Sequence, residues 1–172
     1  MYKKKTILVI LSFCFTPLLY TQNKVSFSNV IDLINSPNSP KDEGLNAFFD
    51  LGSWMGFSLS DNESYTGFSG PYILGLEHGI WTSDKFTSLD LISKDGKSLL
   101  TKLSDSKQNY FPGRLENQMH FKGLHLKNTL IFTSNKTILI TTQITNTGDH
   151  DLNFTPQWNG KIFHQIESFI NK

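Results

Sequence analysis

Apolar and polar residues alternate most clearly in the second half of the chain. Residues 137–145 are dense in β-branched side chains, which favours a strand. Residues 120–132 predict either one strand or two strands with a bulge at Gly123. Residues 86–92 form an apolar run that ends at Asp95-Gly96, and Asp-Gly between two apolar runs indicates a hairpin. A turn at 146–150 precedes a short predicted strand at 152–155.

The pattern is less regular elsewhere. Residues 23–35 fit a short strand or a short helix, which Pro37 and Pro40 end. Residues 110–113 contain Pro-Gly and break the segment before the late strands, while residues 163–170 are compatible with two helical turns. Short strands separated by turns at intervals of about 8–12 residues predict an all-β fold, an antiparallel β-sandwich.

The N-terminus resembles a targeting segment. Lys3, Lys4 and Lys5 precede the apolar stretch 7–20, which is shorter than the roughly 20 residues that span a bilayer. We expect residues 1–21 to be a signal peptide and residues 22–172 to be one exported domain, periplasmic or secreted. An uncleaved anchor is the alternative. Cleavage would remove Cys14, the one cysteine, and with it any disulfide or thiol chemistry.

Charge argues against two classes of partner. The chain has 16 Lys and Arg against 15 Asp and Glu, and loss of the three N-terminal lysines leaves a net charge of −2. No basic stripe is present, so we expect neither nucleic acid nor, after signal cleavage, a membrane as a partner.

Residues 46–56 are the most informative segment. They contain Phe48-Phe49-Asp50-Leu51-Gly52-x-Trp54-x-Gly56, in which aromatic side chains need burial or stacking and glycines allow tight turns or close approach. Further landmarks are Asn29-Val30-Ile31, Gly67-Phe68-x-Gly70, Pro112-Gly113 and Trp158-x-Gly160. In this order, from Asn29 to about Phe163, they resemble the N-terminal β-domain of bacterial glucosidases of glycoside hydrolase family 63.

The resemblance implies a fragment of a large sandwich domain that accompanies a helical catalytic domain, here missing or on another chain. It also implies hydrolysis of α-glucosidic bonds in oligosaccharides by the intact relatives. In that family the catalytic carboxylates belong to the helical domain, and no segment here matches their surroundings. The resemblance therefore implies no catalytic residue in this chain and leaves open whether the polypeptide is itself an enzyme.

Three residues are weak candidates for substrate binding. The Asp50 carboxylate either accepts backbone N–H groups in a tight turn or accepts a sugar hydroxyl. Phe49 and Trp54 either stack on a sugar ring or pack against a domain interface, and packing is favoured. We expect packing for Trp81 and Trp158 as well.

The sequence predicts neither a metal site nor a cofactor. His120 and His125 are five residues apart, which would place them on opposite faces of a continuous strand. Asp149 and Asp151 flank a turn; a calcium loop is the alternative, but the ligand spacing of an EF-hand is absent.

Three hypotheses for function follow. The first is the non-catalytic N-terminal β-domain of an exported glucosidase, which we favour. The second is a free-standing carbohydrate-binding β-sandwich, which requires exposed aromatic side chains on one face. The third is a structural or interaction protein unrelated to sugars.

Overall fold

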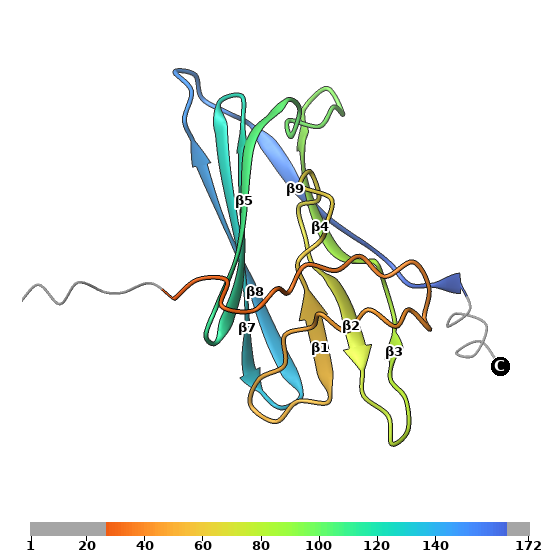
Figure 1. Cartoon of the computed structure of the whole chain (residues 1–172). Coiled ribbons are helices and arrows are strands. Elements are labelled where there is room, and N and C mark those ends of the chain that lie inside the picture. The colour runs from red at the N-terminus through yellow and green to blue at the C-terminus, as the bar shows by residue number, and fades with distance from the viewer. Residues whose placement is uncertain (1–26, 165–172) are drawn as a thin grey trace, which may run out of the picture.

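The computed structural model describes residues 27–164, which form two facing layers of antiparallel strands (Figure 1). One layer is a four-stranded sheet of order β5-β6-β7-β8, with β5 Leu103–Phe111, β6 Arg114–Phe121, β7 Leu124–Ser134 and β8 Thr137–Asn146. The facing layer contains the sheet β1-β2-β3, with β1 Met55–Ser58, β2 Ser69–Ile73 and β3 Ile80–Trp81, and the pair β4-β9, with β4 Lys85–Ser93 and β9 Phe154–Lys161. The predicted all-β antiparallel sandwich is confirmed.

Turn residues define the hairpins of the four-stranded sheet. Gly113 (φ +88°) joins β5 to β6, and Gly123 (φ +80°) joins β6 to β7. Gly123 therefore lies in a hairpin turn between two strands, and the bulge predicted there is wrong. Gly96 (φ +73°) ends β4 as predicted, because its N–H donates to the carbonyl of Ser93.

The core consists of two hydrophobic clusters. Inward-facing positions alternate along β7, so Leu124 and Leu126 contribute to one cluster and Leu130 and Phe132 to the other. Phe57 and Phe68 of the facing layer complete the larger cluster. This period of two is what a half-buried strand requires.

A row of polar side chains separates the two clusters. Gln108, Asn117, Asn128 and Thr142 are register partners across β5, β6, β7 and β8. Asn117 and Asn128 are almost fully buried, and their side-chain amides donate to the carbonyls of Tyr65 and Thr66 at 2.8 and 2.6 Å. The row thereby ties the two layers together through a loop that lies in the core.

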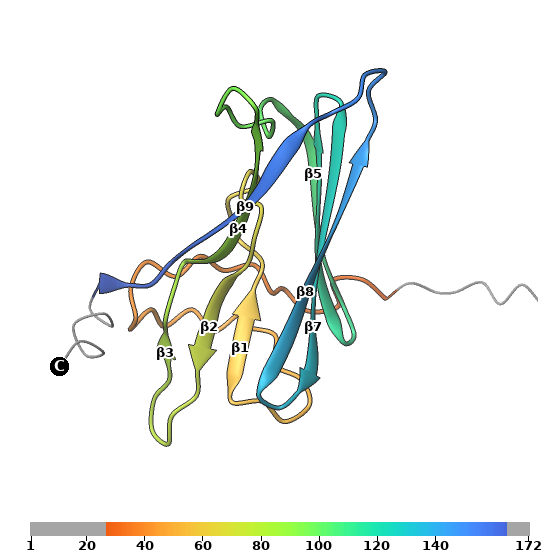
Figure 2. The same cartoon turned by 180° about the vertical axis from the view of Figure 1, so that it is seen from behind.

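One side of the sandwich is closed by the segment that precedes β1. Asn29 hydrogen-bonds the backbone of Tyr110 on β5, and Ile34 forms an isolated bridge with Leu59 at the end of β1. Residues 27–35 therefore form neither the strand nor the helix predicted for 23–35, because their backbone groups pair with two different strands. On the other side, β8 and β9 are the edges of their layers (Figure 2).

The structure confirms some of the predicted strands and differs from others. Strands β4 and β8 confirm the runs at 86–92 and 137–145, while β9 extends well beyond the predicted 152–155. Strands β1, β2, β3 and β5 were not predicted, and the prediction for 120–132 includes only the end of β6, at 120–121. The signal peptide lies outside the described residues, as does most of the predicted C-terminal helix. In residues 27–164 no helix has the length and apolar character needed to cross a membrane.

Candidate functional site

Asp50 shapes a tight turn. Its carboxylate Oδ1 accepts the N–H of Leu51 at 2.7 Å, and its carbonyl accepts the N–H of Ser53 at 2.9 Å. Leu51 and Gly52 both have positive φ, +50° and +70°, as the central residues of a type I′ turn do. These contacts support the turn interpretation of Asp50.

Phe49 belongs to an aromatic row on the outer face of β1, β2 and β3. Its ring meets Tyr72 edge-on at 6.4 Å, and Tyr72 meets Trp81 at 5.1 Å. Gly56 lies beneath the Phe49 ring, where an added Cβ would come within 2.5 Å of it. The glycine is therefore required for close approach of the ring to the strand.

The three tryptophans occupy different environments. Trp81 is fully buried under the segment before β1, and its indole N–H donates to the carbonyl of Gly44 at 3.0 Å. Trp54 is 61% exposed and Trp158 is 50% exposed. The packing expected of all three thus holds within this domain for Trp81, whereas the other two leave much of their rings free.

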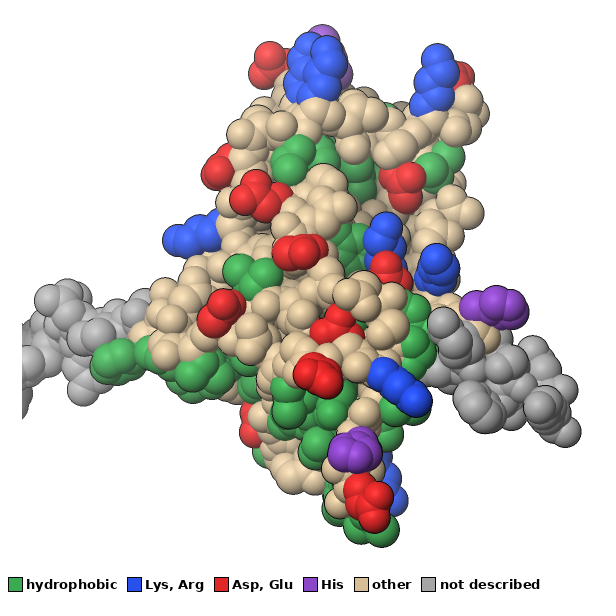
Figure 3. Space-filling view, turned by 45° about the vertical axis from the view of Figure 1, so that its right-hand side comes forward, with side chains coloured by type: hydrophobic (Ala, Val, Ile, Leu, Met, Phe, Trp, Pro, Cys, Tyr) green, Lys and Arg blue, Asp and Glu red, His purple; other side chains and the backbone are tan. Residues whose placement is uncertain are grey.

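A pocket opens beside the aromatic row. It has a volume of about 530 Å³ and combines Tyr72, Leu45 and Leu74 with the charged residues Glu43 and Glu77. Figure 3 shows hydrophobic side chains mixed with charged ones at this end of the molecule, where the β2–β3 hairpin projects. Tyr72 contributes a phenol ring to this lining, and apolar side chains with a few polar groups are typical of small-molecule pockets.

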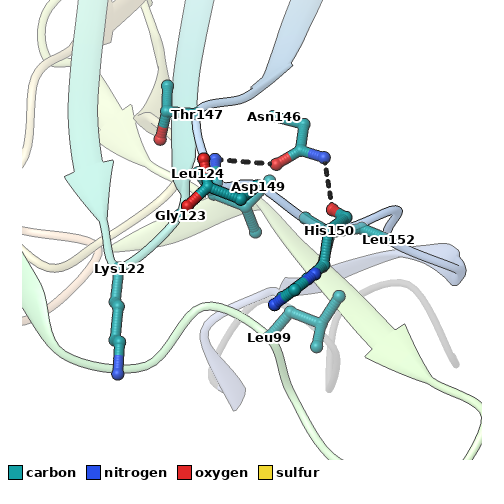
Figure 4. A pocket seen from close by; sticks show the side chains of 10 residues that line it. Leu99, Lys122, Gly123, Leu124, Asn146, Thr147, Asp149, His150 and Leu152 are labelled. Carbon is teal, nitrogen blue, oxygen red and sulfur yellow. Dashed lines mark hydrogen bonds between the residues drawn. The ribbon is translucent and has the colours of Figure 1, made fainter.

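A second pocket of about 420 Å³ lies between the β6–β7 turn and the loop after β8 (Figure 4). The side chain of Asn146 in its lining stabilises the loop itself. Asn146 donates to the carbonyl of His150 at 2.8 Å and accepts the N–H of Gly148 at 3.0 Å. These hydrogen bonds give the Asn146 amide a structural role.

Glu116 is a buried carboxylate that the sequence analysis did not single out. It accepts a hydrogen bond from Arg114 (Nε to Oε1, 2.6 Å) and forms an ion pair with Lys127 (Nζ to Oε2, 3.2 Å). Burial alone would raise the pKa of Glu116, but the hydrogen bonds and charges of the two cations outweigh it and hold the pKa below 4.5. The spacing of Arg114 and Glu116, two apart on one strand, was the available signal.

The positions of His120 and His125 differ from the prediction that they lie on opposite faces. They lie side by side on β6 and β7 with parallel rings 4.2 Å apart, because the hairpin turn at Gly123 places them opposite each other. The prediction of opposite faces assumed one continuous strand and is wrong. Burial, followed by the nearby charges of His120 and Lys127, lowers the pKa of His125.

Other acids serve the backbone. Asp42 accepts the N–H groups of Asn38 and Gly44, and Asp90 accepts that of Leu91. Asp149 and Asp151 are both exposed in the loop after β8. In the part of the chain that the structure describes, no three His, Cys, Asp or Glu side chains are grouped as a metal ion would require.

Comparison with protein families adds the identity of the domain. The model of a family described as "Glucosidase YgjK, N-terminal" matches residues 33–171. The match includes the turn at Asp50, the aromatic row and all nine strands found in residues 27–164. The chain therefore belongs to the family of N-terminal domains of glucosidase YgjK.

Proposed function

We propose that this chain is the non-catalytic N-terminal β-domain of an exported α-glucosidase similar to those of glycoside hydrolase family 63. The intact enzyme would hydrolyse α-glucosidic bonds in oligosaccharides. The observation that carries the proposal is the family match over residues 33–171. The domain would support a helical catalytic domain rather than perform the reaction.

The acids described above favour a non-catalytic role. An inverting glycosidase needs a protonated acid with a raised pKa and a second carboxylate about 6.5–9.5 Å away. The pKa of Glu116 is shifted downward, in the wrong direction for a general acid, and both of its oxygens are engaged by cations. Asp42, Asp50 and Asp90 are engaged by backbone N–H groups.

Exposed apolar side chains supply a surface for the catalytic domain. Trp54 is 61% exposed just before β1, and Leu76 is 98% exposed in the hairpin between β2 and β3. Trp54 also joins this hairpin through its carbonyl, which accepts the N–H of Leu74 at 2.8 Å. A partner domain would bury these side chains, which water otherwise surrounds at a cost in free energy.

The test of a non-catalytic role is a glucosidase assay of the purified chain with chromogenic α-glucosides. We expect no turnover above buffer. Turnover that disappears when Glu116 or Asp50 is replaced by its amide, in variants that remain folded, would refute the proposal.

The test of the partner is binding to a separately produced helical catalytic domain of a family 63 glucosidase. We expect Trp54→Ala to weaken that binding by about 10-fold or more, as loss of an aromatic anchor does. Leu152→Ala is the control, because Leu152 is also an exposed apolar side chain but lies in the loop between β8 and β9.

Carbohydrate binding by the isolated domain is the second candidate. It is favoured by the pocket beside Tyr72 and by the exposed ring of Trp54. Phe49 adds little to this candidate, since its ring packs on Gly56 and Tyr72. Calorimetric titration with malto-oligosaccharides distinguishes the candidates: saturable binding that Trp54→Ala or Tyr72→Ala abolishes would favour this second function.

A further inference from the structure

The sandwich is open along the side where β8 and β9 face each other. Within residues 27–164, each of these strands pairs on one edge only, β8 with β7 and β9 with β4. The opposite side is closed by residues 29–34. Asn29 hydrogen-bonds Tyr110 of β5, and Ile34 forms a bridge with Leu59, just after β1. The two sides therefore differ in how much core they protect.

Inward-facing side chains on the open side remain accessible to solvent. Trp158 is the register partner of Leu89, so both point into the sandwich, yet Leu89 is buried and Trp158 is 50% exposed. Ile140 is likewise the partner of fully buried Leu130 and is itself only half-buried. One more strand beside β8 would lie across from β9 and cover these side chains.

The free edge of β8 lacks the usual protection against pairing. Residues 137–146 contain no charged residue and no proline, and five of them are threonine or asparagine. The edge of β9, in contrast, carries Pro156 and Lys161. Charged residues and proline are the features by which exposed edges avoid further pairing.

We propose that β8 pairs antiparallel with β8 of a second copy of this chain. A strand that fits this edge needs apolar side chains on its inward face and no charged side chain that pairing would bury. Strand β8 itself meets both requirements, because it is uncharged and Ile138, Ile140 and Ile144 face inward. Antiparallel pairing of identical strands about a two-fold axis places the central residue beside its own copy and every other residue opposite one equally far from the centre. Because β8 carries no charged residue, no like charges oppose one another in this pairing. This inference does not depend on the proposed function.

Thr141 provides the test because it lies at the middle of β8 and is exposed. In an antiparallel self-pairing centred on the strand it lies close to its own copy. Thr141→Lys and Thr141→Glu each place like charges together, so each alone is expected to weaken the dimer at least 10-fold. Mixing the two variants places opposite charges together and is expected to restore a heterodimer.

Sedimentation of the purified chain at micromolar to 100 micromolar concentrations gives the readout. A dimer that either charge disrupts, that their mixture restores and that the control Thr101→Lys leaves intact supports the proposal. Thr101 is exposed in the loop between β4 and β5, away from the edge. A monomer at all concentrations, or a dimer or larger species that the Thr141 variants leave unchanged, would overturn it. Circular dichroism and urea midpoints verify that each variant remains folded.

Discussion

Replacing Asn128 by alanine tests whether the buried polar row holds the two layers together. The Asn128 amide donates to the carbonyl of Thr66 at 2.6 Å, and its oxygen accepts the hydroxyl of Thr142 at 2.6 Å. The side chain is 1% exposed, so water cannot replace these partners without local opening. The substitution therefore removes two hydrogen bonds and leaves a carbonyl without a donor.

The expected cost is about 3 kcal/mol of unfolding free energy. An orphaned buried carbonyl costs about 1–3 kcal/mol, and loss of the second hydrogen bond adds about 1 kcal/mol. For a chain of this size, this loss lowers the melting temperature by roughly 6–12 °C. Asn128→Leu separates the hydrogen bonds from the packing, because leucine fills most of the volume but cannot donate to Thr66. If hydrogen bonding dominates, this variant remains at least about 2 kcal/mol less stable than the parent.

Urea denaturation followed by tryptophan fluorescence measures both variants, with the thermal midpoint as a second readout. Thr142→Val is expected to cost about 1 kcal/mol, because it removes only the hydroxyl donor. Gln143→Thr, an exposed change on the same strand, is the control and should stay within about 0.5 kcal/mol. The reasoning fails if Asn128→Leu matches or exceeds the parent in stability.

Three further predictions concern the turn and the titrating side chains. Leu51→Asn should stabilise the fold by about 0.5–1 kcal/mol in urea melts, because asparagine tolerates the φ of +50° better than leucine; an unchanged midpoint would contradict this. The pKa of Glu116 is lowered on folding, so its contribution to stability is present above pH 4.5 and is lost as the pH falls through the folded pKa. Glu116→Gln should cost about 1–2 kcal/mol at pH 7 and flatten stability against pH below 4.5; an unaltered acid limb would show that the ion pairs contribute nothing. The pKa of His125 is also lowered, so the unfolded chain binds its proton first and stability decreases as the pH falls below 6.5. His125→Asn should reduce that slope between pH 7 and 5, and nuclear magnetic resonance titration of the His125 ring gives the direct check.

The sequence predicted the candidate site in part. Asp50 and Gly52 predicted a tight turn, and the structure has one there. Nothing local distinguished buried Trp81 from exposed Trp54, because burial depends on which distant segment covers the ring. The cover of Trp81 is the segment at Pro40 and Gly44, whose carbonyls accept its two N–H groups.

The sequence by itself determined strand β8 and the turn that ends β4. Strand β8 follows from a run of β-branched residues, and the end of β4 follows from Asp95-Gly96, because both signals act within a few residues of the backbone. Only the tertiary structure decided which side chains meet. The stacked pair of His120 and His125 depends on strand register across the turn at Gly123, and the amide of Asn128 needs a carbonyl 62 residues away in sequence. Such contacts form only when strands pair and layers face each other, so no local pattern encodes them.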